Sequence, residues 1–310
     1  MNKSEVYLLS GFLGSGKTTL LKNLLQQERL DGRRAAVLMN ELGSVSIDSD
    51  AVNEDVPLKE LLDGCICCTI SDKLEAQLQS LLIENNPDVI YIEATGAAHP
   101  VEVLDAIVSP LFADRIDFKG IITTVDSKRW LERKKLSPQI QLLLVEQVKH
   151  ANLLLINKTD TLNEEQQANV SMEISLLNPH AFTILTSFAK VPTNHVRKMG
   201  YKKDLLQHRV KVDLQLRTFV YHFKHHIRQE DFENFLREIP ETIYRIKGYV
   251  RFSENSYPYL FQYSYGMPLY MKEYMNMPLN LVFIGENIDW TVLNDMLSDL
   301  EEKQSRKIDK

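Results

Sequence analysis

Gly11-Phe-Leu-Gly-Ser-Gly-Lys-Thr18 lies between the apolar run Val6–Leu9 and a helical pattern over Thr18–Gln27. It matches the phosphate-loop pattern G-x-x-x-x-G-K-[ST] in the strand–loop–helix context that this motif requires. Its glycines let backbone N–H groups surround phosphate oxygens, and the N-terminus of the following helix attracts negative charge. The sequence therefore predicts a nucleotide site directly after the first strand of an α/β domain.

The phosphate loop supplies most of the residues that we expect to bind nucleotide. Lys17 would neutralise the β- and γ-phosphates, and Thr18 would ligate Mg²⁺ through its hydroxyl. The residues expected to bind nucleotide in this segment are Gly11, Gly14, Ser15, Gly16, Lys17, Thr18 and Thr19.

Strand-like apolar runs alternate with helical patterns over the first two thirds of the chain. Several runs are apolar on both faces, which is typical of parallel strands that helices cover on both sides. We therefore expect residues 1–194 to form an α/β P-loop NTPase domain with a mostly parallel, doubly wound sheet. The expected strands are Val6–Leu9, Ala35–Met39, Val89–Ile92, Gly120–Val125, Asn152–Ile156 and Phe182–Leu185, and the first expected helices are Thr18–Gln27 and Ser71–Ile83.

The rest of the chain follows a different pattern. Residues 195–212 are rich in Lys, Arg and His and are expected to form a solvated basic connector. Residues 213–310 are expected to form a smaller α+β C-terminal domain with a mainly antiparallel sheet and a frayed, charged tail. Its expected elements are the strands Leu214–Phe223, Tyr244–Phe252, Tyr259–Tyr263 and Leu279–Ile284 and the helices Gln229–Glu238 and Asp289–Leu300.

The composition of the 310 residues excludes some classes of protein and argues against some classes of binding partner. They are 44% apolar and 25% charged, with a formal net charge of −6. This excludes a largely disordered or fibrous chain, and the negative charge argues against nucleic acid or an anionic membrane as a partner. The apolar runs are too short to span a membrane, and we expect no secretion signal. All three cysteines fall within four residues, which indicates reduced thiols in the cytoplasm rather than a disulfide framework.

Asn157-Lys-Thr-Asp160 has the position and composition of the guanine-specifying loop of GTPases. Asp160 can accept hydrogen bonds from N1–H and the exocyclic amine of guanine, and adenine supplies neither donor. A carboxylate left unpaired in a buried site is costly, so the loop should discriminate strongly against ATP. Asn157, Lys158 and Asp160 are therefore expected to bind GTP or GDP.

Glu93 ends the apolar strand Val89–Ile92 and is expected to associate with Mg²⁺. The Thr95-Gly96 dipeptide that follows offers a flexible backbone N–H near the γ-phosphate, which a segment that senses this phosphate needs. Asp126 ends the next strand and is expected to cap a helix rather than bind a metal ion.

Cys65, Cys67 and Cys68 follow the Asn40–Gly43 segment at the end of the expected second strand. Thiolates are soft ligands that suit zinc or another late transition metal. In extended backbone Cys65 and Cys67 point to the same side and can bind one ion, whereas Cys68 needs a local turn to join them. A closed tetrahedral site needs a fourth ligand, and Glu41 or a histidine is the candidate.

Taken in order, these motifs resemble those of the CobW family of GTPases. The cysteine motif is the most specific of them, because ordinary phosphate-loop GTPases lack it. The C-terminal third is similar to the C-terminal domain of the family more loosely. The stretches that carry the resemblance are Gly11-Phe-Leu-Gly-Ser-Gly-Lys-Thr-Thr-Leu-Leu21, Asn40-Glu-Leu-Gly43, Gly64-Cys-Ile-Cys-Cys-Thr69, Glu93-Ala-Thr-Gly96 and Asn157-Lys-Thr-Asp160.

The resemblance implies a cytoplasmic, GTP-hydrolysing metallochaperone that holds a transition-metal ion and delivers it to a client metalloprotein under nucleotide control. Zn²⁺ is the ion that it implies first, with Co²⁺, Ni²⁺ or Fe²⁺ as alternatives, beside GTP or GDP and Mg²⁺. Lys17, Thr18, Glu41 and Glu93 would be catalytic, with Thr18 and Glu93 at Mg²⁺ and Glu41 among the transition-metal ligands. Gly96 would contact the nucleotide.

The sequence departs from the family pattern at three positions. Leu42 stands where Phe is frequent, Ala94 where relatives often have a hydroxyl, and His99 where Asp is common. The changes at Ala94 and His99 either alter the chemistry of this γ-phosphate-sensing segment or, at His99, supply an extra nitrogen ligand. The long His-rich stretch of many relatives is missing, so metal buffering by that route is not expected.

Two other functions remain open from the sequence: a nucleotide-gated metal sensor or store that acts by binding a partner, and a small-molecule kinase. The kinase leaves Asn157–Asp160 and the thiols unexplained. His222, His225 and His226 form either a solvated strand end or a secondary metal site.

Overall fold

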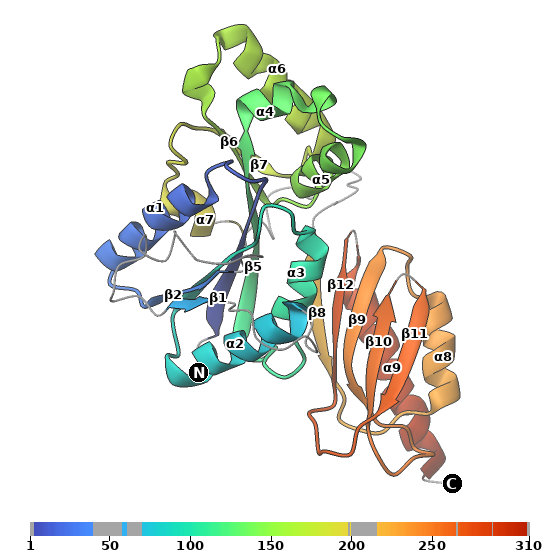
Figure 1. The fold of residues 1–310 in the computed structure, drawn as a ribbon. Helices are drawn as coiled ribbons and strands as arrows, with labels where there is room; N and C mark the ends of the chain where they lie inside the picture. The colour runs from blue at the N-terminus through green and yellow to red at the C-terminus, as the bar shows by residue number, and fades with distance from the viewer. Residues whose placement is uncertain are drawn as a thin grey trace. The chain divides into compact units, whose positions relative to one another are not determined.

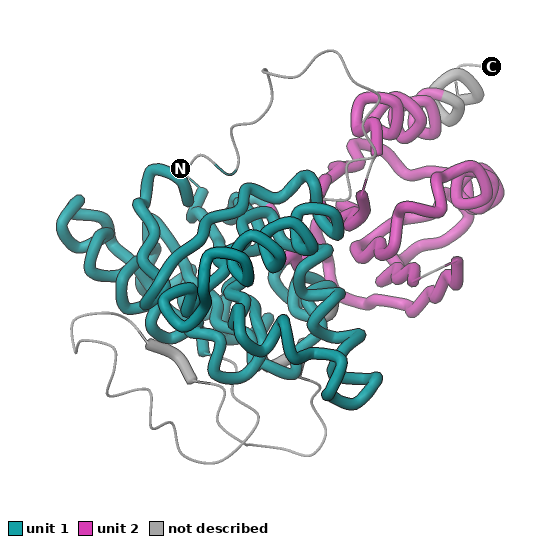
Figure 2. The backbone as a smooth tube through the Cα atoms, turned by 90° about the horizontal axis from the view of Figure 1, so that it is seen from above, with its two compact units in different colours: residues 1–107, 114–210 teal, residues 108–113, 211–310 magenta. Residues whose placement is uncertain are grey.

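The computed structural model describes residues 3–39, 58–60, 70–197, 199, 216–264, 266–286 and 288–308. Its chain divides into two compact units, which Figure 2 colours separately. The first unit comprises Met1–Ile107 and Asp114–Val210, and the second comprises Val108–Ala113 and Lys211–Lys310. Within the described part of the chain, no helix has both the length and the apolar character that a membrane crossing requires.

A seven-stranded parallel sheet forms the centre of the first unit, in the order β3-β2-β4-β1-β5-β6-β7 (Figure 1). Parallel pairing aligns the carboxyl ends of the strands: Leu9 lies opposite Glu93, Met39 opposite both Glu93 and Glu60, and Asp126 opposite Asn157. The strands are β1 (Ser4–Ser10), β2 (Ala35–Met39), β3 (Leu58–Glu60), β4 (Val89–Glu93), β5 (Ile116–Asp126), β6 (Leu153–Asn157) and β7 (Phe182–Leu185).

Helices cover both faces of this sheet, which explains why its central strands are apolar at successive positions. Leu153 and Leu155 of β6 pack with α1 and α7 in one core, whereas Leu154 and Ile156 pack with α4, α5 and α6 in the other. The helices are α1 (Lys17–Leu30), α2 (Ile70–Glu84), α3 (Pro100–Ile107), α4 (Ser127–Leu131), α5 (Pro138–Lys149), α6 (Glu164–Leu177) and α7 (Thr193–Arg197), with short 3₁₀ turns at Arg133–Lys135 and Thr159–Thr161. The predicted doubly wound α/β fold is therefore confirmed.

The second unit contains a five-stranded antiparallel sheet in the order β11-β10-β9-β12-β8, with two helices packed on it (Figure 1). The aromatic side chains Phe232, Phe261 and Phe283 lie in the core between helices and sheet. Its elements are β8 (Arg217–His222), α8 (Gln229–Glu238), β9 (Ile243–Val250), β10 (Tyr259–Ser264), β11 (Met267–Lys272), β12 (Asn280–Gly285) and α9 (Trp290–Ile308). The predicted α+β class of this part is confirmed, but the expectation of a frayed tail after Leu300 is wrong, because α9 continues to Ile308.

A short segment from the middle of the chain, Val108–Ala113, belongs to the second unit. There Asn280 Nδ2 donates a hydrogen bond to the carbonyl oxygen of Pro110, 3.0 Å away. Asn280 is buried, so this bond satisfies a donor that has little access to water. The second unit is therefore not a continuous stretch of sequence.

Candidate functional site

The phosphate loop runs from the end of β1 to the start of α1, and two of its glycines are required both by their backbone conformation and by their close surroundings. Gly11 and Gly16 have φ angles of 132° and 113°, in a region that glycine alone adopts readily. A Cβ atom at Gly11 would also clash with the carbonyl oxygen of Thr124, and one at Gly16 with the side chain of Asn157. By contrast, the space beside Gly14 is open. The loop is thus packed on the protein side and accessible at Gly14, as a phosphate cradle should be.

Lys17, in the first turn of α1, extends its side chain back to this loop. Its Nζ donates to the carbonyl oxygens of Gly11, at 2.9 Å, and Phe12, at 3.5 Å. Only 7% of the residue is exposed, so the ammonium group is held in place above the loop rather than free in solvent. Gly16 caps α1 without a side-chain hydrogen bond of its own, and the positive end of the helix therefore faces the same space.

Thr18 and Glu93 meet beside the loop. Thr18 Oγ1 donates to Glu93 Oε1 across 3.0 Å, and the pairing of β1 with β4 places Glu93 opposite Leu9. A hydroxyl and a carboxylate are hard oxygen ligands of the kind that Mg²⁺ prefers. The residues present therefore fit a magnesium ion beside the phosphate loop.

Asn157, at the end of β6, clamps two loops together. Its Nδ2 donates to the carbonyl oxygen of Ser15 at 2.8 Å, and its Oδ1 accepts from the amide of Ala189 at 2.9 Å. The side chain is buried, so that both bonds are shielded from water. Asn157 thus joins the phosphate loop to the segment after β7.

The segment that follows Asn157 has a fixed backbone. The Asp160 amide donates to Ser187 Oγ at 3.2 Å, and Thr159 Oγ1 donates to the carbonyl oxygen of Thr186 at 3.0 Å. Lys158 adopts the left-handed conformation with φ at 62°. Asp160 itself is exposed, so its carboxylate is available to a ligand.

Asp126 at the end of β5 caps α4, as the sequence predicts. Its Oδ1 accepts from the Arg129 amide at 3.0 Å, and its Oδ2 lies 2.7 Å from Lys158 Nζ. Burial would raise the pKa of Asp126, but the hydrogen bonds from Lys158 and the Arg129 amide, together with both cations, lower it below its ordinary value. The carboxylate is therefore occupied by structural partners.

Gly96 places the turn after β4 against the phosphate loop. A Cβ atom at Gly96 would lie 2.5 Å from the amide nitrogen of Leu13, so only glycine fits at this contact. The carbonyl oxygens of Gly96 and Ala98 accept from Gln147 Nε2 of α5, at 3.2 and 3.5 Å. This turn is held between the phosphate loop and α5.

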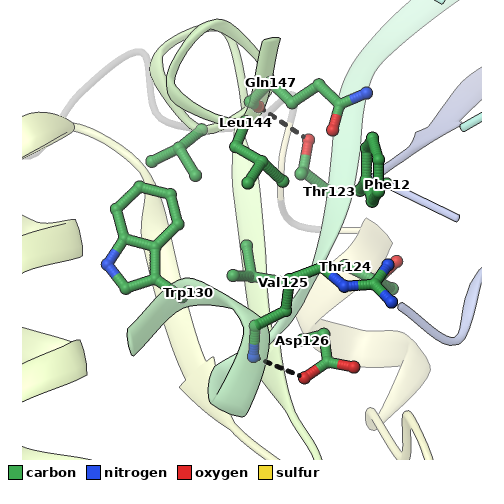
Figure 3. A pocket seen from close by; sticks show the side chains of 10 residues that line it. Phe12, Thr123, Thr124, Val125, Asp126, Trp130, Leu144 and Gln147 are labelled. Carbon is green, nitrogen blue, oxygen red and sulfur yellow. Dashed lines mark hydrogen bonds between the residues drawn. The ribbon is translucent and has the colours of Figure 1, made fainter. Parts of the chain in front are cut away.

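Gln147 also borders a cavity under α5, where its carbonyl oxygen accepts from Thr123 Oγ1 at 3.0 Å (Figure 3). Leu144 and Trp130 line the same space. With a volume of about 10 Å³ it reaches only the minimum that one water molecule needs. This cavity therefore has no room for the acceptor substrate of a kinase.

Several predicted site residues lie outside the described residues. They are Glu41, Cys65, Cys67 and Cys68. The described strands nevertheless show where the chain leaves the sheet before each of them: β2 ends at Met39, ahead of Glu41, β3 ends at Glu60, ahead of the cysteines, and these two strand ends are paired. Both strand ends lie at the edge of the sheet that carries Glu93.

Glu146 and His150 belong to no motif that the sequence alone singles out. Their donor atoms and a donor atom of His99 all lie within 4.8 Å of one another. Burial lowers the pKa of His150, Glu146 opposes this shift, and His99 adds to it. The four-residue spacing on one helix was visible in the sequence, but nothing there placed it beside His99. By contrast, His222, His225 and His226 are exposed.

Comparison with known proteins identifies the two parts of the chain separately. Residues 5–184 match the family described as CobW/HypB/UreG, nucleotide-binding domain. Residues 216–301 match the cobalamin synthesis protein cobW C-terminal domain.

Curated relatives include three proteins named for zinc. The chain is 28% identical to zinc-regulated GTPase metalloprotein activator 1 of Dictyostelium discoideum over 233 residues, covering 64% of this chain and 49% of the relative. It is 35% identical over 163 residues to zinc chaperone YeiR of Escherichia coli, covering 52% of this chain and 48% of the relative. Zinc chaperone CobW of a Sinorhizobium species is 33% identical over 200 residues, with 56% of each protein covered. The chain therefore spans about half the length of the curated relatives that it matches.

Among solved structures, Zn(II)-bound YjiA GTPase of E. coli matches with a TM-score of 0.50 and 21% identity, covering 97% of this chain and 99% of that one. At this identity the similarity establishes the fold.

Proposed function

The chain belongs to the CobW/HypB/UreG family, and we therefore propose that it is a GTP-hydrolysing metallochaperone that carries a transition-metal ion, with Zn²⁺ as the first candidate. The observation that carries the nucleotide part of this proposal is the contact of Thr18 with Glu93 beside the buried Lys17. A cation, a hydroxyl and a carboxylate thus lie beside a loop whose backbone conformation requires glycine.

Each of these side chains has a task in phosphoryl transfer to water. Lys17 would release its bonds to the loop carbonyls and neutralise charge on the β- and γ-phosphates. Thr18 and Glu93 would hold Mg²⁺, which when bound supplies positive charge to the same phosphates. Gly96 would direct its N–H towards the γ-phosphate, and Glu41 would help to orient the attacking water. We propose that Gly11, Gly14, Ser15, Gly16 and Thr19 complete the phosphate site.

The base would be guanine. Asp160 has an exposed carboxylate on a fixed backbone, which suits two hydrogen bonds from N1–H and the exocyclic amine. We assign Asn157 and Lys158 to the same end of the nucleotide. The name of one relative as a GTPase supports this assignment.

The transported ion would bind to Cys65, Cys67 and Cys68, with Glu41 or a histidine as the fourth ligand. Thiolates favour Zn²⁺ over hard cations, and three curated relatives carry zinc in their names. Reduced thiols and a carrier role would suit the cytoplasm, where an acceptor metalloprotein would receive the ion. Co²⁺, Ni²⁺ and Fe²⁺ are the competing ions.

A hydrolysis assay on the full chain with Mg²⁺ tests the nucleotide part. Lys17→Ala should lower the rate of GTP hydrolysis at least about 100-fold, because the charge that it places on the phosphates cannot be replaced by water. Lys22→Ala is the matched control, since Lys22 lies exposed on the same helix. A Lys17→Ala protein that is folded by circular dichroism and hydrolyses GTP at the parental rate would refute the proposal.

Zinc release to a chelating dye tests the carrier part. The zinc-loaded protein should release zinc faster after GTP hydrolysis than with a non-hydrolysable analogue bound. If the rates are equal, hydrolysis does not drive delivery, and the protein is a metal store or sensor instead. The same release measurements with Co²⁺, Ni²⁺ and Fe²⁺ would show which ion responds most strongly to GTP hydrolysis.

A further inference from the structure

His99, Glu146 and His150, which we call the His99 cluster, come together from two separate parts of the first unit. His99 ends the turn after β4 and precedes the first residue of α3, whereas Glu146 lies on α5 and His150 follows its last residue. The spacing of four residues puts Glu146 and His150 on one face of the helix. Glu146 Oε2 lies 3.2 Å from His150 Nε2, and the rings of His99 and His150 are 5.8 Å apart.

We propose that the His99 cluster is a second binding site for a divalent transition-metal ion of the zinc type, separate from the cysteines. Two imidazoles and one carboxylate are ligands that Zn²⁺, Co²⁺ and Ni²⁺ accept, and the cluster as described is made of histidine and glutamate. Donor atoms bound to one such ion lie roughly 3–3.5 Å apart, given bond lengths of about 2.0–2.2 Å. The Glu146–His150 distance already has this value, and the remaining donors, within 4.8 Å, close the gap by rotation of the side chains.

The immediate surroundings leave the cluster open to an ion. Lys149 pairs with Glu146 through Oε1 at 3.0 Å, which leaves Oε2 directed at His150. His150 Nδ1 is buried and has no hydrogen-bond partner within the described part of the chain. All three residues are partly exposed, so an ion can enter and leave. The three described ligands would fill three of the four positions of a tetrahedral ion, whereas a structural zinc site is closed by four protein ligands.

His99 has one competing bond. Its Nδ1 accepts from the Val101 amide at 3.3 Å and so caps the start of α3. An ion on Nε2 would move the ring proton to Nδ1, and this bond would be lost. At this length it is weak, and its loss does not prevent binding.

The His99 cluster is connected to the phosphate loop through Gln147 and Gly96. Gln147 lies between the two ligands of α5 and donates to Gly96 and Ala98, and Gly96 in turn rests against Leu13 of the phosphate loop. An ion that joins His99 to α5 would fix this turn. Metal affinity at the cluster and nucleotide affinity would therefore change together, in both directions and by the same factor. This consequence rests on the proposed nucleotide binding, whereas the metal site does not.

The test begins with a thiol-free variant of the full chain, carrying Cys65→Ser, Cys67→Ser and Cys68→Ser, without nucleotide. Zn²⁺ is titrated in competition with a chelating dye, and Co²⁺ is followed by its visible absorption. The variant should bind about one equivalent of either ion, and the Co²⁺ complex should lack thiolate charge-transfer bands. If no ion binds, the proposal is wrong.

Substitutions then assign the site. His99→Asn keeps a side-chain acceptor for the Val101 amide and removes the imidazole, and His150→Gln and Glu146→Gln keep the shape of α5. Each should weaken Zn²⁺ binding by about 10-fold or more. His225→Gln, at an exposed histidine outside the cluster, should leave it unchanged. Because three independent variants are used and each is checked for folding, one unfolded protein does not decide the result; unchanged affinity in the folded variants overturns the proposal.

The last measurement separates this site from the GTPase function. The thiol-free variant is titrated with Zn²⁺ in the presence of GDP and of a non-hydrolysable GTP analogue. A difference of about 5-fold or more, abolished by His99→Asn, supports the coupling. Zinc binding without any nucleotide binding would leave the cluster in place and refute the proposed GTPase. Nucleotide binding without zinc binding would refute the metal site and leave the proposed GTPase in place.

Discussion

Asp160 combines a fixed backbone with an exposed carboxylate, because Ser187 accepts its amide hydrogen while the side chain faces solvent. A substitution that keeps the size of this side chain should therefore change recognition without changing the fold. Asn in its place offers one acceptor and one donor where guanine needs two acceptors. The position is thus suited to a clean test of base selection.

We expect Asp160→Asn to weaken GTP binding by about 2 kcal/mol or more, since one donor of guanine would be left unpaired. The measurement is competition between GTP and a fluorescent nucleotide, with Asp299→Asn, at an exposed position of the second unit, as control. The parent protein should prefer GTP to ATP. Equal affinities for the two nucleotides would contradict the assignment of Asp160.

Asn157 has a structural role that its sequence motif does not predict. The motif predicts a nucleotide contact, and the structure adds a mechanical role, because the same side chain bonds Ser15 on one side and Ala189 on the other. Both partners are backbone groups more than 30 residues away from Asn157 in sequence. Spacing along the chain carries no information about such bonds, which depend on the order of the strands.

Elements buried on both faces could be predicted from the sequence, and exposed or very short ones could not. β2 has the expected bounds, Ala35–Met39, and β4 (Val89–Glu93) extends the expected run by one residue, because both are buried apolar runs between turn residues. β11 was missed since nearly all its residues are exposed, and an edge strand with little burial shows no apolar alternation. β3 has only three residues, too few to form a pattern.

The same limit applies to the site. The phosphate loop is local and could be found from its residues, whereas the His99 cluster joins residues 47 and 51 positions apart through the packing of α5 on the turn after β4. His99 alone was recognisable as an unusual nitrogen ligand. Its partners required the tertiary structure.

Gly96 allows a test of the contact between this turn and the phosphate loop. In Gly96→Ala the new Cβ would lie 2.5 Å from the Leu13 amide, and two backbone segments would have to separate. We expect GTP hydrolysis to fall at least about 10-fold, because displacement of catalytic groups by about 1 Å is costly. GDP affinity should change little, since GDP lacks the γ-phosphate.

Hydrolysis rates and GDP titrations measure the two effects separately. Ala97→Ser is the control, because Ala97 is exposed in the same turn. Parental hydrolysis by Gly96→Ala would show that the turn does not act on the γ-phosphate.

The second unit includes a segment that lies about 100 residues before the rest of it in the sequence. Val108–Ala113 groups with Lys211–Lys310, and Asn280 bonds Pro110 there. A boundary drawn once along the chain, as a linear domain prediction must be, separates this segment from its unit.

A fragment of residues 211–310 should therefore melt at a lower temperature than the second unit does in the full chain. The loss of the Pro110 acceptor exposes or orphans the buried Asn280 amide, at a cost of about 1–3 kcal/mol. For a unit of this size that corresponds to a decrease in Tm of several degrees or more. Calorimetry of both proteins is the measurement, and equal melting temperatures would contradict this role of the segment.

The largest energetic coupling that we expect is between the binding of nucleotide and the binding of a metal ion by the cysteine thiolates. Met39 and Glu60, the last described residues before the glutamate and cysteine segments, end their strands at the edge where Glu93 meets Thr18. A change at the γ-phosphate should therefore reach both segments. If a GTP analogue tightens zinc binding, zinc must tighten binding of the analogue by the same factor, typically about 5–150-fold.

This prediction is best measured in the His99→Asn variant, so that the cysteines alone report the ion. Zinc affinity by dye competition should differ between GDP and the analogue, and nucleotide affinity should differ by the same ratio with and without zinc. Protons should be released on binding, because thiols with a pKa of about 8.5 must ionise to become ligands. Cys67→Ala should lose most of this zinc affinity and still bind GTP, since the phosphate loop is intact. Identical zinc affinities with GDP and the analogue would mean that the two sites act independently, and nucleotide control of the ion would have to be abandoned.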